Sequence, residues 1–70
     1  MLDARAQHVL YAKVRYKLTV YRPSASSAEI ERATHKAVEA VREDDDMLFD
    51  MLVDVAVRLA TDEMDTHAAS

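Results

Sequence analysis

The 70-residue chain contains no cysteine, no glycine and no tryptophan, and it has a single proline. Without cysteine it can form neither a disulfide nor a thiolate metal site, which fits a reducing cytoplasm. Without glycine it cannot build a phosphate-binding loop or a dinucleotide fingerprint, because both depend on glycine's backbone freedom. These absences predict a cytoplasmic protein that is not a nucleotide-dependent enzyme.

The residues that catalysis or metal binding would need are present but isolated. The three histidines are scattered, and although His35 stands at helical spacing from Glu31 and Glu39, nothing nearby completes a metal site. Residues 42–46, REDDD, lack the alternating ligands and the glycine of a calcium loop. No base stands at a recognisable spacing from the serines. We therefore expect no enzyme activity, no catalytic residue, no metal, no cofactor and no small-molecule substrate.

The chain is short enough that its core is expected to be marginal. One domain over residues 1–70 buries only about 60% of the surface that its unfolded form exposes. Small folds usually add disulfides, a metal or a partner chain, and only the partner chain remains open here. The densest apolar stretch, MLFDMLVDVAVRLA, is interrupted by three charges and is too short to span a bilayer. The sequence also has no signal-peptide pattern, so we expect no membrane association.

Residues 8–22 alternate apolar and polar side chains and stop at Pro23. The even positions would form a core face and the odd positions, from Lys13 to Tyr21, an outer cationic face, as in a half-buried strand. No glycine, asparagine or proline interrupts the stretch, so a hairpin is not indicated. We predict one strand over residues 8–22, preceded by a possible arm over residues 1–7.

The chain after Pro23 has helical periodicity. Ser26 and Glu29 form a capping box, and apolar residues then repeat at spacings of three and four, which predicts a helix over residues 26–43. The repeating apolar residues are Ile30, Ala33, Ala37, Val38 and Val41.

A second, more apolar helix is predicted over residues 46–63, with a frayed tail over residues 64–70. Its charged residues Asp46, Asp50, Asp54, Arg58 and Asp62 recur every four positions and form one narrow row. Because the chain has no glycine, an aspartate of residues 42–46 would carry the turn or cap the second helix. A single helix that bends at this point is the alternative.

A lone strand leaves its backbone groups unpaired, so it needs a partner strand. The economical source is a second copy about a two-fold axis. We therefore predict an α+β fold, with one N-terminal strand and two helices, as an intertwined homodimer with a two-stranded antiparallel intermolecular ribbon. The predicted dimer interface consists of Val14, Tyr16, Leu18, Val20, Leu48, Met51, Leu52, Val55 and Leu59.

The strand KVRYKLTVY, the proline and cap, and the two helices resemble the ribbon-helix-helix family of small DNA-binding dimers, over about residues 12–62. In that family the ribbon lies in the major groove and its outward side chains contact base edges. The resemblance implies a dimeric transcription regulator with an outward face that contacts DNA. The matching positions are Lys13, Arg15, Lys17, Thr19 and Tyr21.

The charge is divided unevenly along the chain. Residues 1–22 carry a net charge of +4 and residues 23–70 a net charge of −8. A basic segment favours nucleic acid as a partner. The alternative hypothesis is a non-enzymatic interaction or inhibitor protein, of phage or plasmid type, that grips another protein through its strand or its acidic helical surface.

Overall fold

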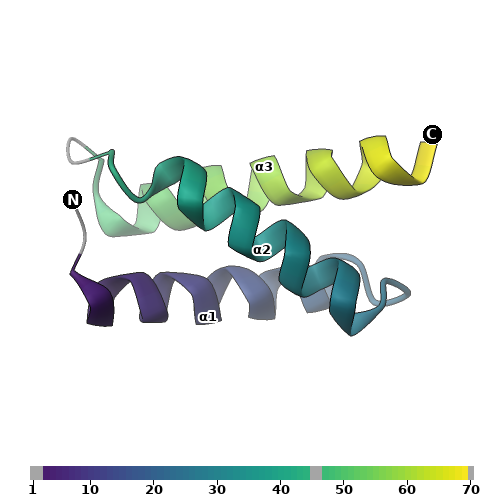
Figure 1. Cartoon of the computed structure of the whole chain (residues 1–70), viewed down its shortest axis with the longest axis horizontal. Helices are drawn as coiled ribbons and strands as arrows, with labels where there is room; N and C mark the ends of the chain where they lie inside the picture. Colours follow the sequence, from purple (N-terminus) through teal and green to yellow (C-terminus); the bar gives the residue numbers. More distant parts are fainter. Residues whose placement is uncertain (1–2, 45–46, 70) are drawn as a thin grey trace.

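The computed structural model describes residues 3–44 and 47–69, the last three of these by their backbone only. This part of the chain forms three α-helices, α1 (Ala4–Tyr21), α2 (Ser27–Val41) and α3 (Phe49–Ala69) (Figure 1). α1 and α3 run in the same direction, and α2 runs back diagonally across them. Each helix contacts both of the others. The described residues contain no strand, so the fold is all-α.

The predicted strand over residues 8–22 is wrong, because this segment belongs to α1. An alternating pattern contains two series with a spacing of four residues, and this spacing also fits a helix with about 3.6 residues per turn. Leu10, Val14 and Leu18 form one such series and are completely buried. Tyr16 and Val20, from the same predicted core face, are 71% and 57% exposed.

Three further predictions depended on this strand and are therefore wrong as well. They are the α+β fold, the intertwined dimer with its intermolecular ribbon, and the ribbon-helix-helix architecture. The reason for expecting a partner strand disappears too, because a helix pairs its backbone groups within itself. α1 begins after Asp3, whose side chain accepts a hydrogen bond from the Ala6 amide at 2.7 Å. No glycine or proline lies within α1. The N-cap and the unbroken helical stretch explain why this segment folds as a helix.

α2 follows the sequence-based expectation closely. The Glu29 amide donates to Ser26 Oγ at 3.2 Å, so Ser26 is the N-cap. All five apolar residues that repeat along the predicted helix are buried. Pro23 lies in the connection from α1, where the Arg22 amide still donates to the Leu18 carbonyl at 2.8 Å.

α2 ends at Val41, and α3 begins at Phe49 and runs back in the opposite sense, so the alternative of one bent helix is wrong. The Asp44 amide donates to the Val41 carbonyl at 3.0 Å, directly after the end of α2. The predicted cap at Asp45 or Asp46 lies outside the described residues, as do Ser70 of the tail and residues 1–2 of the arm. Residues 64–69, expected to fray, continue α3.

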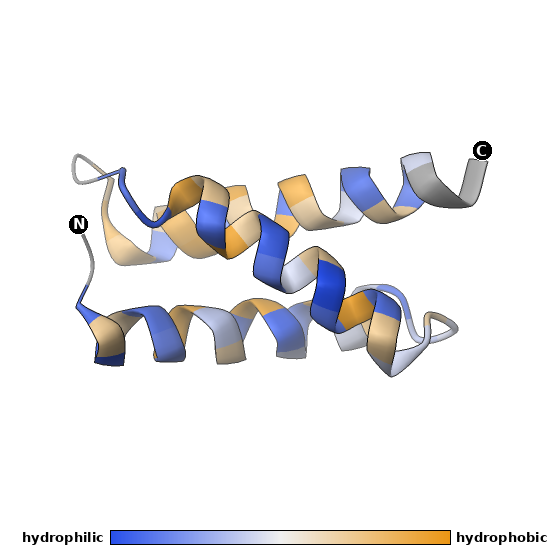
Figure 2. Ribbon diagram, in the orientation of Figure 1, coloured by the Kyte–Doolittle hydropathy of each residue, from blue (hydrophilic) through white to orange (hydrophobic). Residues whose placement is uncertain are grey.

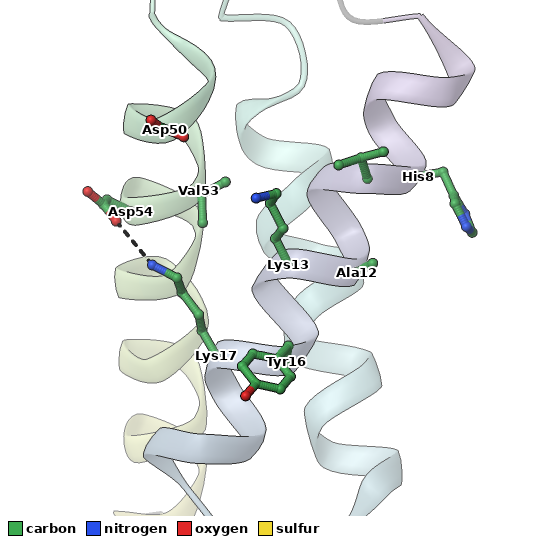
Figure 3. Close-up of a pocket in the computed structure, with 9 residues that line it drawn as sticks. His8, Ala12, Lys13, Tyr16, Lys17, Asp50, Val53 and Asp54 are labelled. Carbon is green, nitrogen blue, oxygen red and sulfur yellow. Dashed lines mark ion pairs between the residues drawn. The ribbon is translucent and has the colours of Figure 1, made fainter.

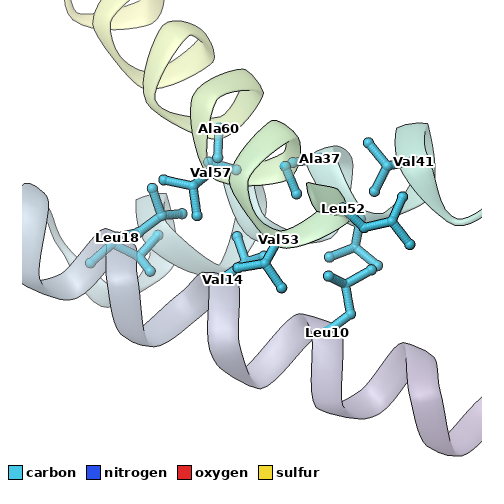
Figure 4. Close-up of a cluster of buried hydrophobic side chains, with 13 residues drawn as sticks. Leu10, Val14, Leu18, Ala37, Val41, Leu52, Val53, Val57 and Ala60 are labelled. Carbon is cyan, nitrogen blue, oxygen red and sulfur yellow. The ribbon is translucent and has the colours of Figure 1, made fainter. Parts of the chain in front are cut away.

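One hydrophobic core lies between the three helices (Figure 4). Its only polar member among the described residues is Thr34, whose hydroxyl donates to the Ile30 carbonyl at 2.6 Å and is therefore satisfied. Burying a large aliphatic side chain stabilises the fold by about 1.5–3 kcal/mol. The thirteen buried hydrophobic residues are Leu10, Val14, Leu18, Ile30, Ala33, Ala37, Val38, Val41, Leu52, Val53, Ala56, Val57 and Ala60.

Candidate functional site

The five residues expected to contact DNA all lie on α1 but do not share a face. Two residues along a helix are separated by more than half a turn, so alternate positions fall on opposite sides. Lys13, Lys17 and Tyr21 lie on the side of α3. Arg15 and Thr19 lie on the other side, where Arg15 reaches α2. The single cationic face that a strand would have presented is therefore divided.

Among the described residues, three cations at or near α1 form ion pairs with carboxylates from the other helices. Arg15 Nη2 lies 3.5 Å from Glu31 Oε1 on α2. Lys17 Nζ lies 3.8 Å from Asp54 Oδ1 on α3. All four of these side chains are partly exposed, so each pair adds little stability. Their main consequence is that the charge of α1 is partly neutralised by its neighbours.

The third pair joins Arg22 to Asp65 by two hydrogen bonds. Arg22 Nε donates to Asp65 Oδ1 at 3.1 Å, and Arg22 Nη2 donates to Oδ2 at 2.8 Å. These hydrogen bonds, with the positive charge of the guanidinium, hold the pKa of Asp65 below its usual value. The pair fastens the end of α1 to the last turns of α3.

A groove with a volume of about 630 Å³ runs between α1 and α3. Its apolar lining residues include Val9, Ala12 and Val53. Figure 3 shows Lys13, Lys17 and Val53 pointing into the gap between the two helices, whereas His8, at the margin, points away. We call this surface the α1/α3 groove. Its lining residues are His8, Val9, Ala12, Lys13, Tyr16, Lys17, Asp50, Val53 and Asp54.

The two walls of the α1/α3 groove carry opposite charges. Lys13 and Lys17 belong to α1, and Asp50 and Asp54 belong to α3. Lys17 and Asp54 pair within the chain. Lys13 and Asp50 lie one helical turn before them, and neither forms an ion pair or a side-chain hydrogen bond anywhere in the described residues. This groove therefore contains one unpaired cation and one unpaired anion.

The residues predicted to form a dimer interface fall into two groups. Val14, Leu18 and Leu52 are buried inside the single chain. The others face solvent wholly or in part, with Leu48, Met51 and Leu59 at 73%, 51% and 42% exposure. Figure 2 shows that the first half of α3 is rich in hydrophobic residues and the second half is more hydrophilic.

We define the α3 stripe as Leu48, Met51, Val55 and Leu59, which are three or four residues apart and therefore lie on one side of the helix. Val55 is half-buried at its centre. Leu59 also lines a small apolar hollow of about 140 Å³ with alanines of α2, closed on one side by the Lys36–Glu63 ion pair at 3.0 Å. The α3 stripe thus lies on the α2 side of α3, away from the α1/α3 groove.

Nothing in the described part of the chain is arranged as a metal site, since no three histidine or carboxylate side chains there are grouped to hold an ion. His35 instead lies 3.5 Å from Glu39 on its own helix. Within residues 3–44 and 47–69 none of the helices combines the length and hydropathy that a bilayer-spanning segment requires.

Sequence reasoning missed the carboxylates that pair with α1. Glu31, Asp54 and Asp65 lie on other helices, and the ion pairs depend on tertiary structure. The four-residue spacing of the aspartates did predict that Asp50 and Asp54 share one side of α3.

Comparison with known proteins adds no assignment. No protein-family model matches this chain, and searches of the curated proteins and of the solved structures find no match. The resemblance to ribbon-helix-helix proteins is therefore not tested by relatives, although the strand on which it depended is a helix.

Proposed function

We propose that this chain is a non-enzymatic protein-interaction module that binds an amphipathic, basic helix of another protein along the α3 stripe. The observation that carries the proposal is the exposure of Leu48, Met51 and Leu59 on one side of a single helix. A row of large apolar side chains costs solubility when it faces water, and such patches commonly mark interaction sites. Apolar residues at spacings of three and four are also the anchors used when one helix docks on another.

The surroundings of the α3 stripe favour a basic partner. The charged row Asp50, Asp54, Arg58 and Asp62 runs beside it and contains three acids and one base. On the α2 side, Lys36 is already paired with Glu63 and supplies no free cation. Complementary charge accelerates association and excludes partners of the wrong sign. An acidic or uncharged helix should therefore bind more weakly than a basic one.

DNA binding by α1 is the competing hypothesis from the sequence. It no longer has a ribbon to enter the major groove, and Arg15, Lys17 and Arg22 are paired with carboxylates. These pairs reduce the cationic charge available to phosphates. The surface therefore supports protein binding better than DNA binding, and a DNA duplex serves as a parallel ligand in the experiment below.

The test uses a fluorescent synthetic helix with leucines at three- and four-residue spacings and lysines elsewhere, titrated with the full chain. Its controls are a scrambled peptide without an apolar face and an acidic version with glutamates. We expect Met51→Ser to weaken binding about tenfold, since the loss of one buried large side chain removes roughly that much affinity. Val20→Ser, at a similarly exposed position on α1, should leave binding unchanged.

Two outcomes would overturn the proposal. One is equal affinity for the scrambled peptide, and the other is indifference to Met51→Ser. A random DNA duplex is titrated in parallel between about 50 and 200 mM salt, where DNA binding predicts a log-log slope of about −0.9 per phosphate neutralised. Such a slope without peptide binding would replace protein binding with DNA binding.

We also propose that the module acts in the cytoplasm, because a chain without cysteine gains nothing from an oxidising compartment.

A further inference from the structure

We infer that two copies of this chain associate through the α1/α3 groove about a two-fold axis parallel to both helices, so that α1 of each copy faces α3 of its partner. Unlike the ribbon dimer expected from the sequence, this dimer joins two complete three-helix bundles without exchanging elements. It also uses a different surface from the α3 stripe, which lies on the α2 side of α3.

The charges on the groove walls make the surface complementary to itself. The α1 wall presents Lys13 and Lys17, and the α3 wall presents Asp50 and Asp54. The Lys17–Asp54 pair shows that the tips of these two side chains meet in the groove, and Lys13 and Asp50 each precede them by one helical turn. A cationic row therefore runs beside an anionic row along the groove.

The direction of the helices selects the symmetry axis. α1 and α3 are parallel (Figure 1). When two copies meet face to face, an axis across the helices would place α1 on α1 and α3 on α3, with like charges opposed. An axis along the helices places each α1 on the partner's α3, with opposite charges opposed. Because like charges across an interface are costly, the second arrangement is favoured.

The chain also supplies charges with no partner of their own. Lys13 and Asp50 form no bond within the described residues, although both line the groove. In the inferred dimer, Lys13 faces the partner's Asp50, and the symmetry axis repeats this contact. The ring of Tyr16 projects from the groove wall (Figure 3), and Val9, 40% exposed, lines the groove about two turns earlier on α1. Covering these two side chains would supply apolar contact area beside the cationic row.

The test measures the oligomeric state of the full chain by sedimentation velocity, from micromolar to submillimolar concentration. We expect a dimer whose dissociation constant rises with salt, because the charged rows are screened. Lys13→Glu and Asp50→Lys should each weaken it about tenfold, because each change opposes like charges at two symmetric positions. Neither side chain bonds within the chain, so both variants should keep the wild-type circular dichroism spectrum.

Mixing the two variants is the sharpest step. In the mixed dimer, position 13 of the Lys13→Glu variant faces position 50 of the Asp50→Lys variant, so this contact again joins opposite charges. At the second contact, Lys13 of the Asp50→Lys variant faces Asp50 of the Lys13→Glu variant, as in the wild type. We expect the heterodimer to form with nearly wild-type affinity, measured by fluorescence transfer between differently labelled chains. Failure of the mixture to restore association would overturn the inferred pairing of α1 with α3.

Two controls separate the groove from other surfaces. Asp62→Lys changes the charge of α3 by the same amount without altering a groove residue, and Leu59→Ser alters the α3 stripe. Both should leave the dimer intact. A wild-type chain that stays monomeric at every concentration, or a dimer that only Leu59→Ser disrupts, would refute the inference. If a charge-swapped variant fails to fold, Tyr16→Ala takes its place, and an unchanged dimer would again refute it.

Discussion

Two rows of side chains on α1 have the same spacing and opposite environments. Leu10, Val14 and Leu18 point between α2 and α3 and are completely buried (Figure 4). Tyr16 and Val20, offset by two residues, face solvent. Both rows are apolar, so hydropathy alone does not decide which row is buried. The row that faces α2 and α3 is the one that becomes buried. The difference separates a row that stabilises the bundle from one that is available for contacts with other molecules.

Shortening one side chain in each row tests the difference between them most directly. Leu18→Ala should lower the free energy of unfolding by about 2–5 kcal/mol, because it removes buried contacts and leaves a cavity. Val20→Ala, at an exposed position, should change it by no more than about 0.5 kcal/mol. Urea unfolding followed by circular dichroism measures both. Equal losses would contradict the assignment of the two rows.

The helical nature of α1 can be tested at its first residue. Asp3→Ala removes the side chain that accepts from the Ala6 amide, and should cost about 1 kcal/mol of unfolding free energy. Asp62→Ala removes an exposed carboxylate with no such contact and serves as the control. The same unfolding experiment applies. A loss at Asp3 no larger than that at Asp62 would argue against the N-cap and against a helix that begins there.

The smallest expected effect concerns the fastening of α1 to the end of α3. Because the pKa of Asp65 is lower when folded than when unfolded, its contribution is present above the unfolded value, about 3.9, and is lost as pH falls through the folded value. The melting temperature should therefore be higher for the wild type than for Asp65→Asn at neutral pH, and the gap should close in acid. Asp62→Asn is the control. A gap that persists in strong acid would exclude the ionised pair as its cause.

The sequence was sufficient for α2 because its signals are local. Ser26 and Glu29 mark the start within four residues, and Ile30 to Val41 show a period that only a helix fits. Their burial followed from the pattern alone.

The same reasoning failed for α1, since a four-residue repeat such as Leu10, Val14 and Leu18 is also part of an alternating pattern. The choice between them is made by residues far along the chain, such as Leu52, which packs into the same core. Asp3 was the local signal that could have identified the helix, because an N-cap followed by a long stretch without glycine or proline favours one.

The candidate surfaces also combine features that can be predicted from local sequence with features that depend on the tertiary structure. The charged row of α3 could be read from its spacing, but the ion pairs of Arg15 and Lys17 join residues on different helices and required the fold. The prediction that α3 takes part in dimer contacts remains untested, and the inferred contact places its charged row, not its apolar stripe, at the interface.

The short connections between the helices have a kinetic consequence. Only residues 22–26 and 42–48 separate the three elements, so most contacts form between segments close in sequence. Helical bundles of this kind have low contact order and fold in about microseconds to milliseconds. The part of the chain that the structure describes has no strand edge that would need a second chain during that time. Each bundle can therefore fold from one chain alone, and in the inferred dimer two copies could separate and exchange without unfolding.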